Sequence, residues 1–361
     1  MMKTPMTSRA LAAPITALVL CAGCDDSTGP SGTDAPFKLE VAYEFPSLTA
    51  ENFIVNFGFG GDGSLWVGTF QGSVIRVKNG QQTKFDGPSV PVAQIRDLFI
   101  DSGGRPWIAA GNAVAVFENE AWKLQSPPGF FGLSPKVGQV AVSASGDVLL
   151  GVGDFDAGGL LLRRGGQWQA ITPFNSGLPG PITLDIDVAP DGSFWVVSDG
   201  GVSRIAGNEV VFALKSLASG LLYTWIDDVA IGAGRVWLGY DVPIFSVPGV
   251  PDGGMQSLSL AGGDPVSYFP YESGLSSNRV RSIVVPDNGE VWFSTTLDED
   301  SGCKTCVSSV GFRDASGRFH VVSYLNSDLE PNAFMPWIGK GPNGDIYVAH
   351  ADRNQILKVV R

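Results

Sequence analysis

Short apolar runs alternate with Gly-rich turns along the chain from about residue 37 onward. Residues 187–205 show the unit. One apolar run ends at Asp191-Gly192, a short run centred on Trp195 follows, and a second turn at 199–201 leads into residues 202–205. Asp-Gly between apolar runs favours a hairpin, because a two-residue turn with positive φ matches the twist of the strands that it joins. The stretch therefore predicts three strands and two tight turns.

This unit recurs along the whole chain. An apolar or aromatic marker stands three positions after each hairpin glycine, and the glycines lie 41 to 55 residues apart. The glycine and marker pairs are Gly63 and Trp66, Gly104 and Trp107, Gly146 and Leu149, Gly192 and Trp195, Gly234 and Trp237, Gly289 and Trp292, and Gly344 and Tyr347. Seven such copies predict an all-β fold, a seven-bladed β-propeller of four-stranded antiparallel blades. Radial packing buries the sheet faces that a single blade would expose.

The two ends of the repeat predict how the ring closes. The last copy has only one strand after its marker strand, at residues 355–360, and so lacks an outer strand. Residues 37–46 form an alternating run that belongs to no complete blade. We expect them to pair antiparallel with residues 355–360 and complete the last blade.

The first residues form a targeting segment. Lys3 and Arg9 precede an apolar run at residues 10–20, which is too short to span a bilayer. The run ends in Leu20-Cys21-Ala22-Gly23-Cys24, which resembles a bacterial lipoprotein lipobox with Cys24 as the lipidated residue, although Cys21 replaces the usual leucine. An ordinary secretory signal is the alternative. We predict a signal peptide at 1–23, a flexible tether at 24–36 and one propeller at 37–361.

Composition and charge narrow the partners. The chain is 44% apolar and 17% charged, which is too apolar for a disordered protein. Its formal net charge is −12, and removing the leader would make it more acidic. An acidic surface argues against nucleic acid as a partner, so we expect contact with a membrane only through the lipid. We expect an exported monomer on the periplasmic or cell-surface side of a membrane.

Two segments carry a family resemblance. Residues 175–179, Asn-Ser-Gly-Leu-Pro, and residues 272–283 resemble the first part of the two-component regulator propeller repeat. Residues 63–69, Gly-Ser-Leu-Trp-Val-Gly-Thr, resemble its second part. In that family the propeller is usually the periplasmic sensor half of a histidine kinase. No later segment here is apolar enough to cross a membrane and no kinase part follows, so the resemblance implies a stand-alone binding propeller.

The loops that differ between copies hold the candidate binding residues. In a propeller the loops between second and third strands emerge on the same face as the connections between blades, and ligands usually bind there. Acidic and aromatic side chains gather in these loops. The candidates at this mouth are Asp154, Asp156, Asp199, Trp225, Asp241, Arg279, Trp337, His350 and Asp352. They could hold a small molecule, an oligosaccharide or a protein loop.

Cys303 and Cys306 lie in the longest of these loops. No histidine follows them, so covalent haem attachment is not supported, and no second cysteine pair completes a zinc site. In an exported protein a disulfide is the expected state of such a pair. A redox dithiol is the alternative, although the sequence lacks the helix start that usually lowers a thiol pKa.

Two functions fit these features. The first is a non-catalytic, lipid-anchored, sensor- or scaffold-like propeller that binds a ligand or protein and has no metal or cofactor. The second is a metal-assisted lyase or hydrolase, because streptogramin lyases share the hairpin pattern. That resemblance implies two histidines and a glutamate around a divalent cation, whereas this chain has only His320 and His350. The lyase hypothesis therefore needs His350 and a carboxylate to converge on one substrate position.

Overall fold

The structure is a computed structural model, and it describes residues 35–361 apart from 91–93, 131, 133, 154–156, 216–218, 241–252, 297–306 and 332. The expected signal peptide, Cys24, most of the tether, Asp154, Asp156, Asp241, Cys303 and Cys306 lie outside these residues. The predictions that rest on them stay predictions.

The chain forms seven four-stranded antiparallel sheets, which confirms the predicted seven-bladed propeller. Each sheet is one blade, numbered here in chain order and described from its inner to its outer strand. The blades are blade 1, β2 (Ile54–Phe59), β3 (Leu65–Thr69), β4 (Val74–Lys78) and β5 (Gln81–Phe85); blade 2, β6 (Asp97–Ile100), β7 (Pro106–Ala110), β8 (Ala113–Glu118) and β9 (Ala121–Gln125); blade 3, β10 (Val137–Val142), β11 (Val148–Gly153), β12 (Gly158–Arg164) and β13 (Gln167–Ile171); and blade 4, β14 (Thr183–Val188), β15 (Phe194–Ser198), β16 (Gly201–Ala206) and β17 (Glu209–Leu214).

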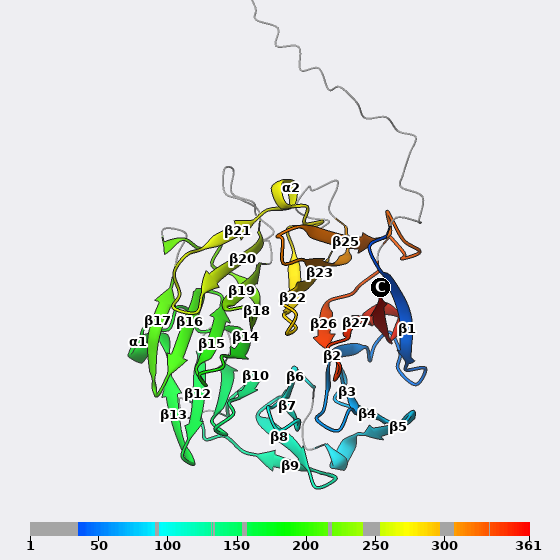
Figure 1. The fold of residues 1–361 in the computed structure, drawn as a ribbon. Coiled ribbons are helices and arrows are strands. Elements are labelled where there is room, and N and C mark those ends of the chain that lie inside the picture. Colours follow the sequence, from blue (N-terminus) through cyan, green and yellow to red (C-terminus); the bar gives the residue numbers. More distant parts are fainter. Residues whose placement is uncertain are drawn as a thin grey trace, which may run out of the picture.

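The remaining three blades follow the same order. They are blade 5, β18 (Ile226–Gly232), β19 (Arg235–Tyr240), β20 (Gly254–Ser259) and β21 (Val266–Tyr268); blade 6, β22 (Val280–Val284), β23 (Val291–Thr295), β24 (Ser309–Arg313) and β25 (Phe319–Ser323); and blade 7, β26 (Trp337–Lys340), β27 (Ile346–His350), β28 (Gln355–Val360) and β1 (Lys38–Glu44). The inner strands contact one another in the order β2, β6, β10, β14, β18, β22, β26 and back to β2. The ring of blades is therefore closed (Figure 1).

The first and last strands of the chain close the ring. β1 pairs antiparallel with β28 from Lys38 opposite Val360 to Glu44 opposite Gln355, as the sequence predicts. Figure 1 shows blue β1 beside the red carboxyl-terminal strands. Phe37, just before β1, is buried and meets Trp292 of blade 6 edge-on at 5.1 Å between ring centroids. Closure therefore rests on side-chain packing between blades as well as on strand pairing.

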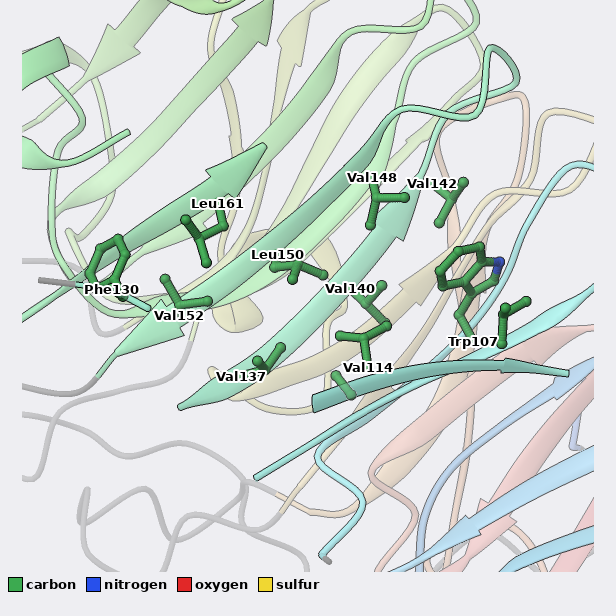
Figure 2. Close-up of a cluster of buried hydrophobic side chains, with 12 residues drawn as sticks. Trp107, Val114, Phe130, Val137, Val140, Val142, Val148, Leu150, Val152 and Leu161 are labelled. Carbon is green, nitrogen blue, oxygen red and sulfur yellow. The ribbon is translucent and has the colours of Figure 1, made fainter. Parts of the chain in front are cut away.

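The apolar cores lie between adjacent blades. Trp107 of β7 packs with side chains of blade 3, among them Val140, Val148 and Leu150 (Figure 2). Trp66 packs in the same way against blade 2, and Trp195 against blade 5. Each of these marker aromatics therefore fills the space between its own blade and the next, which is a structural role.

Only short helices interrupt the described strands. α1 (Pro173–Ser176) and α2 (Pro270–Ser273) are single turns that end at Gly177 and Gly274, both with positive φ. Two 3₁₀ turns span Gly87–Ser89 and Ala351–Arg353. In the part of the chain that the structure describes, no helix has the length and hydropathy needed to cross a bilayer.

Candidate binding face and axial channel

One residue in each inner strand occupies the same position around the central axis. In each blade this residue pairs with a residue of the second strand that lies two places after the marker residue. In blade 4, for example, the marker is Trp195 and Asp185 pairs with Val197. The seven equivalent residues, from blade 1 to blade 7, are Asn56, Asp97, Gln139, Asp185, Asp228, Ser282 and Trp337. We call them the axial ring. Six of the seven are polar, although they lie in strands that are otherwise largely apolar.

The polar members of the axial ring bond to the backbone of the next blade. The six bonds join Asn56 Nδ2 to the Leu98 carbonyl (3.3 Å), the Val140 N–H to Asp97 Oδ2 (3.0 Å), Gln139 Nε2 to the Leu184 carbonyl (2.7 Å), the Val229 N–H to Asp185 Oδ2 (3.0 Å), the Ile283 N–H to Asp228 Oδ2 (2.8 Å) and the Ile338 N–H to Ser282 Oγ (3.4 Å). Asp187, two residues beyond Asp185, accepts a further bond from the Ile231 N–H at 2.7 Å. The ring therefore ties neighbouring blades together where no β-ladder joins them.

Four carboxyl groups, those of Asp97, Asp185, Asp187 and Asp228, line a cavity of about 260 Å³ at the axis. Burial among the inner strands raises the pKa of Asp97 to about 6 and that of Asp187 to about 6. Burial also raises the pKa of Asp185 and of Asp228, and repulsion from neighbouring carboxylates adds to the increase. The axis is thus a place where negative charge is costly.

A second set of equivalent residues stands just before the inner strands, at the loop-rich face. In five blades the carbonyl of this residue accepts a hydrogen bond from the backbone where the second strand ends, as the Phe53 carbonyl does from the Phe70 N–H. The five residues are Phe53, Lys136, Ile182, Arg279 and Phe334. Trp225 stands at the corresponding place before β18. We call these six residues the mouth rim.

The mouth rim is aromatic and basic. Phe53 stacks on Phe70 with ring centroids 5.1 Å apart, and the Phe70 side chain is 40% exposed. The Phe334 and Trp337 ring centroids lie 6.4 Å apart, with the two rings steeply inclined. Lys136 is exposed and Arg279 half-buried. The rim therefore offers flat apolar faces and two cationic groups around the opening of the channel.

The acidic candidates described at this face accept hydrogen bonds from backbone N–H groups. Asp199, in the turn between β15 and β16, accepts the Ile182 N–H at 3.1 Å, and burial raises its pKa. Asp352, in the 3₁₀ turn after β27, accepts the Phe334 N–H at 2.9 Å. Each acid thus fixes a member of the mouth rim. The structure brings Asp352, Phe334 and Trp337 together in blade 7, and places Trp225 and Arg279 before the inner strands of blades 5 and 6.

His350 lies away from the axis. It ends β27, its side chain is 4% exposed, and it lines a cavity between the outer parts of blades 6 and 7 whose wall includes β1. It does not line the axial cavity. His320 is farther out, on β25, where it stacks on Phe312 and bonds to Asp314 at 2.8 Å. The structure therefore places His350 close to Asp352 and Arg353, and away from the axial cavity.

The described residues do not form a metal centre. Within those ranges no group of three or more His, Cys, Asp and Glu side chains is arranged to hold a metal ion. Each axial carboxylate accepts at least one backbone N–H of the next blade. Their chemistry is structural, since these bonds hold neighbouring blades in register.

The candidates from the sequence include Trp337 but none of the polar residues of the axial ring, and they omit half of the mouth rim. Phe53, Lys136 and Ile182 are not among the candidates from the sequence, yet each stands where the loop-rich face meets the channel. A signal exists for them, because each directly precedes an inner strand and so belongs to the repeat. The bonds of the axial ring have no such signal, since each partner lies 42 to 56 residues away in the chain.

Comparisons with known proteins agree on the fold. No protein-family model matches the chain, and no curated protein matches it. Among solved structures it is similar to a streptogramin B lyase, with a TM-score of 0.65 and 15% identity over 90% of this chain and 97% of the lyase. It is also similar to the extracellular domain of BT3049 from B. thetaiotaomicron, described as a putative hybrid two-component system, with a TM-score of 0.67 and 17% identity over 91% of this chain and 41% of that one.

A third neighbour is a variant of a lyase. A histidine-to-alanine form of virginiamycin B lyase from Staphylococcus aureus, described as catalytically inactive and solved with quinupristin, matches with a TM-score of 0.65 and 14% identity over 90% of this chain and 99% of that one. At these identities the likeness establishes a shared propeller architecture. This chain spans less than half of the BT3049 structure.

Proposed function

We propose that this protein is a non-catalytic, extracytoplasmic binding propeller whose ligand contacts the mouth rim. The observation that carries the proposal is the chemistry of that rim and of the side chains beside it: Phe53 stacks on Phe70, Phe334 lies beside Trp337, and Lys136 and Arg279 are basic. Aromatic faces pack on sugar rings or apolar groups, and basic side chains bind carboxylates. An acidic oligosaccharide combines both features and is the ligand class that we favour.

The proposal gives the two described acids of this face a role in its backbone structure. Asp199 and Asp352 accept backbone N–H groups of the rim residues Ile182 and Phe334. Their carboxylates therefore shape the rim, which also carries aromatic and basic side chains. The extracytoplasmic part of the proposal rests on the leader sequence and agrees with the extracellular neighbour BT3049.

A thermal-shift panel tests the ligand class. We expect oligogalacturonate to raise the melting temperature and neutral cello-oligosaccharides or Ca²⁺ alone to have no effect. The variant Lys136→Gln should weaken the response to oligogalacturonate by about tenfold in apparent affinity, since one cationic contact is lost. The control Lys84→Gln, on the outer strand β5, should leave it unchanged. No response to any sugar, or an equal response in Lys136→Gln, would reject the proposed ligand.

We also propose that Cys24 is lipidated and anchors the protein. Cys24→Ser should move the protein from the detergent phase to the aqueous phase in a detergent-partition experiment. Cys21→Ser, which alters the unusual position of the lipobox, should leave it in the detergent phase. Aqueous partition of the unmodified protein would instead indicate an ordinary secretory signal.

The position of His350 supports the non-catalytic proposal over the lyase alternative. That alternative needs His350 and a carboxylate at one substrate position at the mouth, whereas His350 is buried between the outer parts of blades 6 and 7. His320 lies on the outer strand of blade 6. Incubation with quinupristin should therefore leave that compound intact, and its conversion to a product would overturn the non-catalytic proposal.

A further inference from the structure

A cavity of about 400 Å³ lies between blades 2 and 3, at the end of the propeller opposite to the loop-rich face. Its wall includes the turn at 145–146 between β10 and β11 and the turn at 165–166 between β12 and β13. Trp107, Val142 and Val148 also line it, and Figure 2 shows these three side chains near one another. The volume is within the range of small-molecule sites.

The repeat shows why space remains at this interface. In blades 1 and 5 an aromatic residue of the fourth strand stacks on the marker tryptophan of the second strand. The two pairs are Phe85 on Trp66, with ring centroids 6.0 Å apart, and Tyr268 on Trp237, with ring centroids 5.8 Å apart. The strand register puts Gln125 of β9 at the equivalent position of blade 2. Blade 2 therefore has an amide where the other two blades have a ring.

The marker of blade 2 lacks such a ring. In the part of the chain that the structure describes, no aromatic side chain stacks on Trp107, and the Arg105 guanidinium lies 5.9 Å from its ring centroid. Both Trp107 and Gln125 line the cavity. The cavity thus lies beside the tryptophan, where the fourth strand carries a smaller side chain.

Arg163 of β12 faces the same interface. Side chains alternate along a strand, and Leu161, two residues before Arg163, packs in the core between blades 2 and 3. Arg163 Nη1 donates to Gln125 Oε1 across the interface at 3.1 Å, and Arg163 forms no ion pair with the described residues. The other charged residues of the cavity are paired: Arg105 with Asp101 and Glu118, and Asp147 with Arg164. The cavity therefore contains one guanidinium that no carboxylate neutralises.

The interface between blades 5 and 6 shows how such an arginine meets a ring. Arg313 of β24 holds the position of Arg163 in the repeat, since each pairs with the residue just before the marker of its own blade. The Arg313 guanidinium lies 5.2 Å from the ring centroid of Tyr268. Because Gln125 stands at the position of Tyr268, a ring placed there would lie beside Arg163.

We propose that this cavity binds a small aromatic carboxylate. Its ring would take the place beside Trp107 that Tyr268 has in blade 5, and its carboxylate would accept hydrogen bonds from Arg163. One guanidinium without an ion-pair partner favours a monoanion, since a second negative charge would lie near Glu118. The site is at the opposite end of the propeller from the mouth rim, so it stands or falls separately from the oligosaccharide proposal.

Benzoate and benzamide share a shape and differ in charge, so isothermal titration calorimetry with both tests the role of the guanidinium. We expect benzoate to bind at least about tenfold more tightly than benzamide, and inorganic phosphate not to bind. Arg163→Gln should weaken benzoate binding by about tenfold or more. Lys136→Gln is the control, because it removes the same charge from the mouth rim and should leave benzoate binding unchanged.

Gln125→Tyr tests the place of the ring. It introduces the side chain that blade 5 carries at this position, so it should fill the cavity and abolish benzoate binding without lowering the melting temperature. The proposal is overturned if benzoate does not bind or if benzamide binds as tightly. It is also overturned if Lys136→Gln weakens benzoate binding and Arg163→Gln does not, or if a folded Gln125→Tyr variant binds benzoate as the unmodified protein does.

Discussion

The Asp185 carboxylate in blade 4 accepts a hydrogen bond from the backbone N–H of Val229 in blade 5, with 3.0 Å between Oδ2 and N. This bond crosses a boundary that no β-ladder spans. Five further polar side chains at equivalent positions bond to the next blade in turn. Carboxylates used in this way carry a cost, because a charged group beside the axis is poorly solvated.

We therefore predict that Asp185→Asn changes how stability depends on pH. A carboxyl with a raised pKa in the folded state binds more protons there than in the unfolded chain, so the free energy of unfolding falls as pH rises between the two pKa values. The amide that replaces the carboxylate would still accept the Val229 N–H but carries no charge. The free energy of unfolding of the variant minus that of the unmodified protein should rise by about 1 kcal/mol or more from pH 5 to pH 8. Urea denaturation at the two pH values measures both free energies. The prediction would be wrong if the free energies of unfolding of the two proteins changed with pH in the same way.

Asp191→Asn should change the pH dependence of stability in the opposite direction. Hydrogen bonds from Ser193, together with Arg204, lower the pKa of Asp191, so its contribution to stability is lost as pH falls. The variant should be less stable than the unmodified protein at pH 7, and the difference should shrink toward pH 3. Urea midpoints at the two pH values measure it, and a difference that grows in acid would refute the assignment.

Phe37→Ala should weaken the closure between the first and last strands. Phe37 is 2% exposed and packs against Trp292 and Phe312 of blade 6. Truncation should lower the free energy of unfolding by about 3 kcal/mol, because it removes a buried ring and leaves a cavity. Phe174→Ala is the matched control: that side chain is 90% exposed, and its loss should leave the unfolding midpoint unchanged. Equal effects in the two variants would argue against closure by side-chain packing.

Arg76→Ala should destabilise the contact between blades 1 and 2. The Arg76 guanidinium bonds to Asp62 and to Glu120 of the next blade, and it lies over the rings of Trp66 and Phe117. We expect a loss of about 2 kcal/mol in urea denaturation, mostly from lost packing on the aromatic rings, since both acids are partly exposed. Arg318→Ala removes a side chain that is 77% exposed and should have no measurable effect. An Arg76→Ala variant as stable as the unmodified protein would show that this contact does not contribute to stability.

Gly200→Ala should distort the loop-rich face. A Cβ at Gly200 would lie 2.5 Å from the Pro179 carbonyl oxygen and 2.8 Å from the Gly180 nitrogen, and backbone atoms cannot turn aside as side chains can. We expect the melting temperature to fall, with a cost of about 1 to 3 kcal/mol. Gly138→Ala is the control, because a Cβ there meets nothing within 4 Å. Unchanged melting of both variants would show that the two loops can separate freely.

The sequence by itself determined the number of blades and the way in which the propeller closes. The spacing of Gly192 and its counterparts predicts seven blades, because tight turns with positive φ are local and favour glycine. The alternating run before residue 46 and the missing last strand predict the pairing of β1 with β28, since unpaired strand edges are unfavourable. These features are encoded by neighbours in sequence, so a single chain is enough to recognise them.

The tertiary structure alone decided which polar groups meet. In the sequence Asp185 is one more acid in a strand, and only the packing of blade 4 against blade 5 brings it to the Val229 N–H. His350 follows the last marker strand and is expected from the sequence at the mouth, whereas the structure buries it in a cavity walled by the closing strand β1. Both outcomes depend on contacts between distant segments, and the hydrophobic pattern of one blade does not specify its neighbour's backbone.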